Sequence, residues 1–549
     1  MPCNPVQTKP SGPAAVFPAA GVHRPLRPIA RDTSDFPKLR RNGCIYVDKT
    51  AWFHRLLTDP GANCWFLSRP RRFGKSLMLS TFKAIFQGRR DLFDGLAISR
   101  TDWAWERHPV LHFNFAGLST VTVERFDGDF AESVRASLTE AGAGYDSGIS
   151  PGQNFARAIE SLGADGRGVA ILIDEYDAPV AHALSDVPKA EAIRERLSDF
   201  YVQMKDRTGA IRFLMMTGVS KFSKLSVFSA LSNIVDVSTD VPECATMLGY
   251  TEEELEANFE DHLRAHAEAM GLPYGEYRAE LKRWYNGFRF SPDVETTVYN
   301  PISVAMALAV KRPVFGPTWA ATGRPSMLMN YLRREDLLAR DYERVEGVSA
   351  LEFDVADLRA LKPVGMLFQA GYLTIRDRVP GADLFTLGVP DEEVRQDMAM
   401  LVTGVAAGQD VAWAASLGAK LLAARWPEFF AGLGSLYAHL PWGSTENAPH
   451  EASFARPLCT LLASQGFRWR AEDAQSDGRA DLVAEHKIGT WIFELKVGDS
   501  AEDAIGQIRR KGYAAPYLAS GKPVWAVGLS FDRDTRRLLS HAVERIAAT

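Results

Sequence analysis

Short, almost uninterrupted apolar runs recur through the first half of the chain. They cover residues 63–68, 110–115, 168–173 and 211–217. Strands that are covered on both faces have this pattern, which is typical of parallel sheets. Segments with helical apolar spacing stand between the runs, and residues 76–87 directly follow the first run. The pattern therefore predicts an α/β core with a parallel sheet that ends near residue 240.

The patterning changes along the chain and predicts four parts. Residues 1–33 contain seven prolines and little periodicity, so we expect a flexible leader. Residues 34–245 hold the α/β core, and residues 246–430 have mainly helical spacing, as a lid or linking region would. Residues 431–549 include a polar candidate linker at 445–449 and then predict a helix, a hairpin, a strand, a helix and a strand.

Composition and charge restrict the compartment and the binding partners that we expect for the protein. The chain has 549 residues and a net charge of −5, so any contact with nucleic acid must come from local basic surface. The five cysteines contain no CxxC pair, which argues against a disulfide framework or a zinc knuckle and fits a reducing compartment. No apolar run approaches the roughly 18 residues that a membrane span needs. We therefore expect a cytoplasmic protein that has no membrane partner.

A basic loop between the first strand and the following helix is a candidate phosphate-binding loop. In such a loop, backbone N–H groups and the helix N-terminus hold phosphate. Lys75 would reach the β- and γ-phosphates of ATP, and Ser76 would bind Mg²⁺. The standard pattern has glycine where this chain has Arg69, so the loop takes a different path here. The alternative interpretation is a basic turn without a ligand. The candidate nucleotide-binding residues of the loop are Arg69, Pro70, Arg71, Arg72, Phe73, Gly74, Lys75 and Ser76.

Two acidic residues, Asp174 and Glu175, follow the third apolar run. Ligands of open parallel sheets bind at the carboxyl edge, where these residues would lie. Asp174 would hold Mg²⁺ through water, and Glu175 would polarise the water that attacks the γ-phosphate. The fourth run ends in Thr217, and Ser220 follows shortly after it. Thr217 or Ser220 would sense the γ-phosphate, or these residues would simply cap the strand. The alternative for the two acids is a strand that ends in solvent.

A hairpin near the C-terminus brings two more carboxylates together. With its turn at residues 487–488, Glu485 pairs with Thr490, and counting back along both strands places Asp481 opposite Glu494. Opposed residues share one face of the sheet, with Cβ atoms about 5 Å apart. The hairpin therefore predicts that both carboxylates project from the same face.

Lys496 lies two residues beyond Glu494 and shares that face. Asp481 and Glu494 would bind Mg²⁺, with Mn²⁺ as an alternative metal. Bound metal polarises a phosphodiester and lowers the pKa of a water, while Lys496 would position that water or stabilise charge. The alternative interpretation is a solvent-facing hairpin with a salt bridge.

The chain resembles a bacterial AAA-ATPase-like family whose phosphate loop reads RPRRFGKS and whose C-terminus carries a PD-(D/E)XK nuclease module. The resemblance spans residues 35–545 or so, and the missing first glycine of the loop is shared by that family. It implies a P-loop sheet core and a nuclease signature made of Asp481, Glu494 and Lys496. The nuclease superfamily often adds an acidic residue on the preceding helix and a glutamine on the following helix, which Glu451 and Gln507 match. The segments that carry the resemblance are 46–50, 69–76, 173–177, 217–222, 285–288 and 371–374, together with the three signature residues.

These features predict an α/β protein that binds and hydrolyses ATP and thereby regulates a fused, Mg²⁺-dependent nuclease, with DNA favoured over RNA as its substrate. One alternative is an ATP-driven switch whose C-terminal domain binds nucleic acid or protein without cutting. Another is an RNase. The sequence leaves homo-oligomer formation open.

Overall fold

The computed structural model describes ten stretches of the chain. These are residues 26–31, 34–221, 233–239, 241–309, 315–317, 342–349, 352, 362–440, 451–475 and 478–547. The predicted linker at 445–449 lies outside the described residues, as do residues 1–25 of the expected leader. Residues 26–31 run beside the first helices, where the Ile45 N–H donates to the Pro28 carbonyl over 2.9 Å.

The N-terminal part contains a five-stranded parallel sheet. Its strands are β1 (Cys64–Ser68), β2 (Val110–Asn114), β3 (Val169–Asp174), β4 (Ile211–Gly218) and β5 (Val235–Asp236). They lie in the order β2-β3-β4-β1-β5. The four strands expected from the apolar runs are confirmed, and β5 is a two-residue addition at the edge beside β1.

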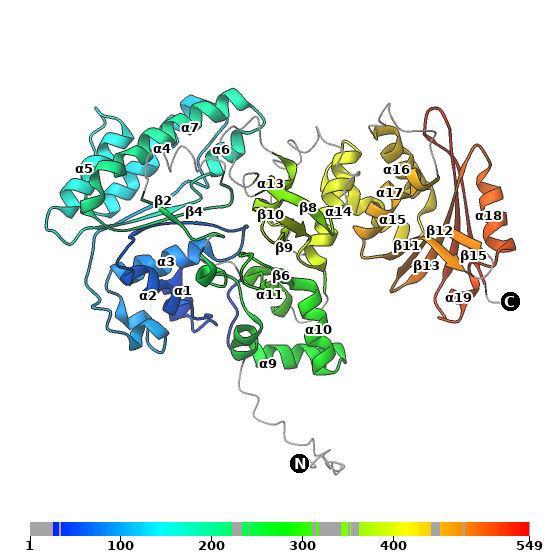
Figure 1. The fold of residues 1–549 in the computed structure, drawn as a ribbon, viewed down its shortest axis with the longest axis horizontal. Helices are drawn as coiled ribbons and strands as arrows, with labels where there is room; N and C mark the ends of the chain where they lie inside the picture. Colours follow the sequence, from blue (N-terminus) through cyan, green and yellow to red (C-terminus); the bar gives the residue numbers. More distant parts are fainter. Residues whose placement is uncertain are drawn as a thin grey trace, which may run out of the picture.

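Helices cover both faces of this sheet, as its doubly apolar strands require (Figure 1). Neighbouring side chains on a strand point to opposite faces, so Phe66 and Trp65 of β1 enter two different clusters. On one face lie α1 (Phe36–Arg41), α2 (Thr50–Thr58) and α3 (Lys75–Phe86). On the other lie α4 (Val123–Glu140), α5 (Pro151–Gly163), α6 (Ala178–Ala183) and α7 (Val187–Tyr201). Short 3₁₀ helices cover Arg90–Leu92, Ala97–Arg100, Val202–Ala210 and Pro242–Cys244.

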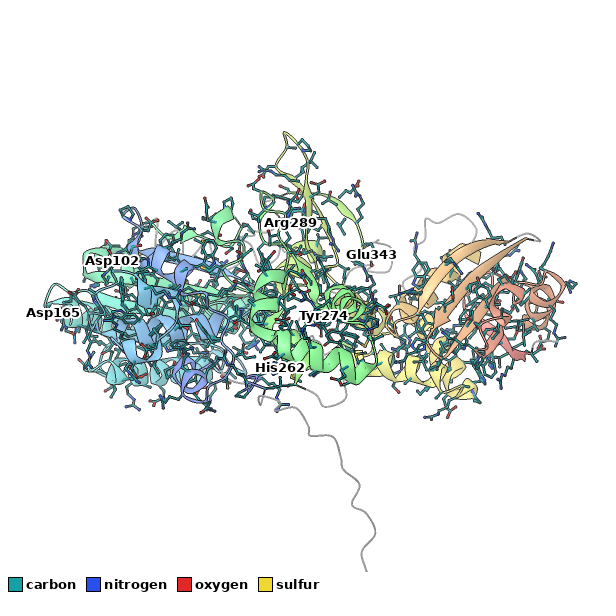
Figure 2. All side chains as sticks on the ribbon, turned by 90° about the horizontal axis from the view of Figure 1, so that it is seen from below. Asp102, Asp165, His262, Tyr274, Arg289 and Glu343 are labelled. Carbon is teal, nitrogen blue, oxygen red and sulfur yellow. The ribbon has the colours of Figure 1, made fainter. Side chains whose placement is uncertain are left out.

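The middle part is helical, as expected, and also holds two small sheets. Its helices are α9 (Glu252–Met270), α10 (Tyr274–Tyr285), α11 (Pro301–Leu308), α13 (Pro363–Ala370) and α14 (Glu392–Ala406). The next two helices, α15 (Val411–Leu422) and α16 (Trp426–His439), share an apolar cluster with the C-terminal sheet. One sheet pairs β6 (Asn286–Phe288) with β7 (Val298–Tyr299), and the other has the order β8 (Val345–Ser349), β10 (Leu384–Gly388), β9 (Thr374–Arg378). Figure 2 shows this part, with His262 and Tyr274, between the N-terminal and C-terminal parts.

The phosphate-loop segment packs directly on the middle part. The ring of Phe73 lies edge-on to Phe288 and Phe290, with centroid distances of 4.8 and 5.1 Å. Gly287 has φ 144°, and a Cβ there would lie 1.9 Å from the Pro390 carbonyl oxygen. The 285–288 segment thus contacts both the phosphate loop and the residues that lead into α14.

The C-terminal part is a five-stranded mixed sheet with helices on both faces. In chain order it contains α17 (Glu451–Ala463), β11 (Arg468–Gln475), β12 (Gly478–His486), β13 (Gly489–Val497), α18 (Ala501–Arg510), α19 (Ala515–Leu518), β14 (Val524–Phe531) and β15 (Leu538–Ile546). The strands are ordered as numbered, and only β13 and β14 run parallel. The predicted register is confirmed, since Glu485 pairs with Thr490. Helix α17 packs on one face and α18 on the other.

Among the described residues, no single helix has the length and apolar composition to cross a membrane. Helices α14 and α15 pass that test only as a pair, and they are bent by 105° at their junction. Buried residues of α14, including Leu401 and Val402, pack inside the protein.

We expect Gly287→Ala to lower the free energy of unfolding by more than about 3 kcal/mol, because the new Cβ would overlap a backbone carbonyl and the residue has positive φ. Gly271→Ala is the matched control. Gly271 also has positive φ, but no atom lies within 4 Å of its Cβ position, so it should cost about 1 kcal/mol. Denaturant unfolding followed by circular dichroism measures both, and equal losses would contradict the steric argument.

Candidate active sites

The loop between β1 and α3 is built around a buried lysine. Lys75 is the first residue of α3, and Gly74 precedes it with φ 91°, a conformation that glycine adopts without steric cost. The Lys75 Nζ donates to the carbonyls of Arg69 and Pro70 over 2.9 and 3.1 Å, and it lies 4.0 Å from Glu175 Oε1. The lysine is therefore held at the mouth of the loop by the loop's own backbone.

Arg69 points away from this mouth into the interior. Its guanidinium donates to the carbonyls of Ser238 (2.5 Å) and Cys244 (3.3 Å) and lies 4.1 Å from the ring centroid of Phe290. Burial lowers the pKa of this guanidinium to about 10. The side chain thus anchors the loop, and only the Arg69 backbone is available to the mouth.

A cavity of about 430 Å³ opens beside the loop. From the loop it is lined by Arg72, Phe73, Gly74, Lys75 and Ser76, and opposite them by Glu175. The rest of its wall is mainly apolar, although it also includes Arg31, Ser34 and Lys49. It comes from residues 29–31, 34, 39, 45–47, 49, 53, 77–78, 248–250 and 259 and from the start of α11. Residues 29–30, which the sequence assigns to the leader, therefore form part of this wall.

Arg71 and Arg72 carry the remaining charge of the loop. Arg72 has φ 71°, a left-handed conformation that is uncommon outside glycine. Burial lowers the pKa of the Arg72 guanidinium, and the nearby carboxylate of Glu393 opposes this shift. Arg71 does not line the cavity, but its charge acts on Glu175.

The two carboxylates after β3 have different surroundings. Asp174 is 1% exposed, and its Oδ1 accepts the Thr217 hydroxyl over 2.8 Å. Glu175 lies next to Lys75 and has φ 52°. Burial raises the pKa of Glu175, and the positive charge of Lys75 works against this shift. A carboxylate with a raised pKa beside a lysine suits a group that orients or deprotonates water.

Sequence reasoning gave no role to two polar residues at this edge. Asn114 ends β2 and donates to Asp174 Oδ2 over 3.5 Å. Asp177 is buried and accepts hydrogen bonds from Val219 and Ser220. Asp177 and Ser220 both lie in segments that carry the family resemblance, and for Asp177 this was the only indication in the sequence that the residue belongs to the site.

The second candidate site lies on the α18 face of the C-terminal sheet. Glu494 Oε1 accepts from Lys496 Nζ over 3.0 Å and from the Gln507 amide of α18. The other oxygen, Glu494 Oε2, is buried without a hydrogen-bond partner among the described residues. Asp481 Oδ2 accepts the Leu495 N–H over 2.8 Å. Four of the five residues predicted for this site therefore converge.

Electrostatics at this site favour a cation. Burial and, to a lesser extent, the neighbouring charge of Asp481 together raise the pKa of Glu494 to about 7, against the opposing effect of Lys496. The part of the chain that the structure describes has no group of three acidic, histidine or cysteine side chains arranged for a metal. Mg²⁺ is commonly held by one or two carboxylates, waters and substrate phosphates, so this pair fits it. Glu451 begins α17, but its side chain lies outside the described residues.

Comparisons with known proteins agree with this layout. A family model described as a predicted AAA-ATPase matches residues 30–228, and the PD-(D/E)XK nuclease superfamily model matches residues 449–541. An uncharacterized protein in the vnfD 5' region of Azotobacter chroococcum mcd 1 is 34% identical over 543 residues, covering 96% of this chain and 100% of that one. No solved structure matches.

The fold and its two sites define a P-loop protein of the AAA-like class with a nuclease-superfamily domain at its C-terminus. The chain belongs to the predicted AAA-ATPase family and carries a PD-(D/E)XK nuclease superfamily domain at its C-terminus.

The raised pKa of Glu494 predicts a pH-dependent stability. In metal-free protein the folded state keeps this proton up to pH 7 or so, whereas the unfolded chain releases it near its ordinary value of 4.5. The folded state binds more protons in that window, so the free energy of unfolding should fall as pH rises through it. Glu494→Gln should remove this contribution, and Glu502→Gln, an exposed carboxylate of α18, should not. Urea unfolding in EDTA at pH 4.5 to 8 tests the difference, and an unchanged slope in Glu494→Gln would contradict it.

Proposed function

We propose that the protein binds and hydrolyses ATP in the cavity beside the phosphate loop, and that this nucleotide site regulates a Mg²⁺-dependent nuclease at the C-terminal site. DNA is the substrate that we propose for the nuclease. One observation carries the ATP proposal: Lys75, Ser76 and Glu175 line one cavity whose remaining wall is mainly apolar.

The two ends of the cavity suit the two ends of ATP. At the loop, phosphate oxygens would replace the Arg69 and Pro70 carbonyls as acceptors for the Lys75 ammonium. Away from the loop, Leu248, Phe259 and Ile302 offer apolar surface to a purine ring. Ser76 and Asp174 would hold Mg²⁺, which neutralises charge on the phosphates. Glu175 would then orient the attacking water.

The nuclease proposal rests on Glu494 Oε2, which is buried and has no hydrogen-bond partner among the residues that the structure describes. A buried charged oxygen without a donor is costly, so an approaching cation would compensate for the cost. Asp481 and Glu494 would hold the metal, which supplies Lewis-acid stabilisation to a phosphodiester. Lys496 and Gln507 fix the other Glu494 oxygen and keep the carboxylate oriented. The exposed residues Arg510 and Lys511 at the end of α18 offer positive charge for a nucleic-acid backbone, whereas the neighbouring Arg509 is paired with Glu544.

Regulation is supported by a packed route between the two sites. Phe73 of the phosphate loop contacts Phe288, and Gly287 lies against Pro390, two residues before α14. Helix α14 in turn packs on α17, the helix that covers the nuclease sheet. A change in the loop would therefore reach α17 through contiguous side chains.

A second candidate function is an ATP-driven switch whose C-terminal domain binds nucleic acid without cutting it. The 3.0 Å ion pair between Lys496 and Glu494 favours it, because this pair neutralises the carboxylate without a metal. Cleavage assays separate the two functions.

Glu175→Gln should bind ATP with parental affinity and hydrolyse it about 100-fold more slowly or worse, because the amide keeps the shape but cannot take a proton. Steady-state phosphate release and a nucleotide titration measure the two effects. Lys75→Ala should lose ATP binding itself. Glu195→Gln, an exposed glutamate of α7, is the matched control and should behave like the parent. Parental turnover in Glu175→Gln would assign the water-orienting role elsewhere.

Asp481→Ala should reduce metal-dependent cleavage by about three orders of magnitude, because a metal ligand worth several kcal/mol is lost. Binding of DNA should persist, since a carboxylate that repels phosphate is removed. Labelled single- and double-stranded DNA and RNA, with Mg²⁺ or Mn²⁺ and with or without ATP, provide the assay. Asp534→Ala, an exposed residue of the β14–β15 turn, is the matched control. Absence of cleavage by the parent on every substrate would favour the binding switch, and undiminished cleavage by Asp481→Ala would remove this site.

A further inference from the structure

The turn that follows β4 lies between the two halves of the nucleotide site. Strand β4 sits between β1, which leads into the phosphate loop, and β3, which leads into the carboxylates. On the phosphate-loop side, the Ser68 hydroxyl donates to the Val219 carbonyl over 2.7 Å, and the Arg69 N–H donates to the Gly218 carbonyl over 3.2 Å. One side of the turn is thus tied to the base of the loop.

Asp177 ties the other side of the same turn. Its Oδ1 accepts the Val219 N–H over 3.2 Å, and its Oδ2 accepts the Ser220 N–H over 2.7 Å and the Ser220 hydroxyl as well. The residue is 2% exposed. A buried carboxylate is stable only with several donors, and here three donors from one turn meet it. We name this set of bonds the Asp177 clasp.

Two further contacts align the turn with the carboxylates. The Tyr176 N–H donates to the Thr217 carbonyl and the Tyr176 hydroxyl donates to the Ser220 carbonyl, both over 3.0 Å. The approach is close, since a Cβ on Gly218 would lie 2.4 Å from Asp177 Oδ1. When the turn is seated, the Thr217 hydroxyl reaches Asp174 over 2.8 Å.

We propose that Asp177 is a positioning residue for ATP hydrolysis, which acts by clasping the β4 turn so that Asp174 and Glu175 keep their working positions. The inference rests on the proposed ATPase function. Asp177 is not among the residues that line the cavity, so it acts through its neighbours. Glu175 stands between Asp174 and Asp177, both of which bond to the β4 segment. These two anchors hold Glu175 at its left-handed φ of 52°.

The structure gives the Thr217 hydroxyl a different role from sensing the γ-phosphate. This hydroxyl donates a hydrogen bond to the Asp174 carboxylate, and the Thr217 side chain is fully buried. Loss of the clasp would loosen the chain at the end of β4, next to this hydroxyl. Asp174 and Glu175 would then be displaced together, while the phosphate loop would remain in place.

The test compares ATP turnover and ATP binding in Asp177→Asn, Ser220→Ala and the double variant. Asp177→Asn keeps the shape but can turn an amide N–H₂ toward the two Ser220 donors, so the maximal rate should fall about 10- to 100-fold. Nucleotide affinity without Mg²⁺ should stay within about twofold of the parent, because Lys75 and the loop are untouched. Ser220→Ala removes only the hydroxyl and should cause a smaller loss. The double variant should be no slower than Asp177→Asn, because both changes act on one clasp.

The controls separate this inference from the proposed function. Asp186→Asn changes a carboxylate that caps α7 by accepting the Lys189 N–H, so it should lower stability slightly and leave the maximal rate unchanged. If the parent hydrolyses ATP and both Asp177→Asn and Ser220→Ala keep its rate, the clasp is overturned and the ATPase stands. A parent that binds no ATP overturns both. If Asp177→Asn does not fold, Ser220→Ala carries the test, with parental turnover as the overturning result.

Discussion

The parallel register of β1, β4 and β3 is the constraint on which the proposed nucleotide site depends. Ser68 at the end of β1 pairs with Gly218 of β4, and Ile173 of β3 pairs with Met216. The three strands therefore end at one edge within a residue or two of each other. Strand pairing brings the phosphate loop, the Thr217 hydroxyl and the two carboxylates to the same edge of the sheet, although about 140 residues separate Lys75 from Thr217. A shift of one residue in this register would turn Asp174 to the opposite face.

The sequence pattern predicted those elements whose structure is determined by residues close together in the chain. Four strands, the helix after the phosphate loop and the Glu485–Thr490 register follow from runs and alternation that stand in the sequence. The inward turn of Arg69 does not, because its acceptor Ser238 and its ring partner Phe290 are distant along the chain. The bonds of Asp177 to Ser220 likewise exist only once β3 and β4 are paired. The strands of the two small sheets have two to five residues, too few to show a period.

The two candidate sites differ in how fully the oxygens of their buried carboxylates are hydrogen-bonded. Asp174 has its Oδ1 satisfied by Thr217, and its surroundings are settled before any ligand arrives. Glu494 has one oxygen shared by Lys496 and Gln507 and one oxygen without a partner among the described residues. Low local dielectric makes the satisfied group rigid and the unsatisfied oxygen costly. The proposed nucleotide site is thus preorganised by hydrogen bonds, whereas the candidate C-terminal site carries an energetic cost that a bound cation would relieve.

The aromatic packing of Phe73 limits which segments of the chain can be exchanged by recombination. Its apolar cluster includes Phe66 of the sheet and also Val394 and Leu401 of α14, although the matched ATPase segment ends at residue 228. A recombination event that exchanged residues 30–228 alone would leave one wall of Phe73 against foreign side chains and would lose burial on both sides of the junction. The segment that the family model matches is therefore smaller than the part of the protein that shares one hydrophobic core. Lineages of this protein should pass on the phosphate loop and the middle part as one piece.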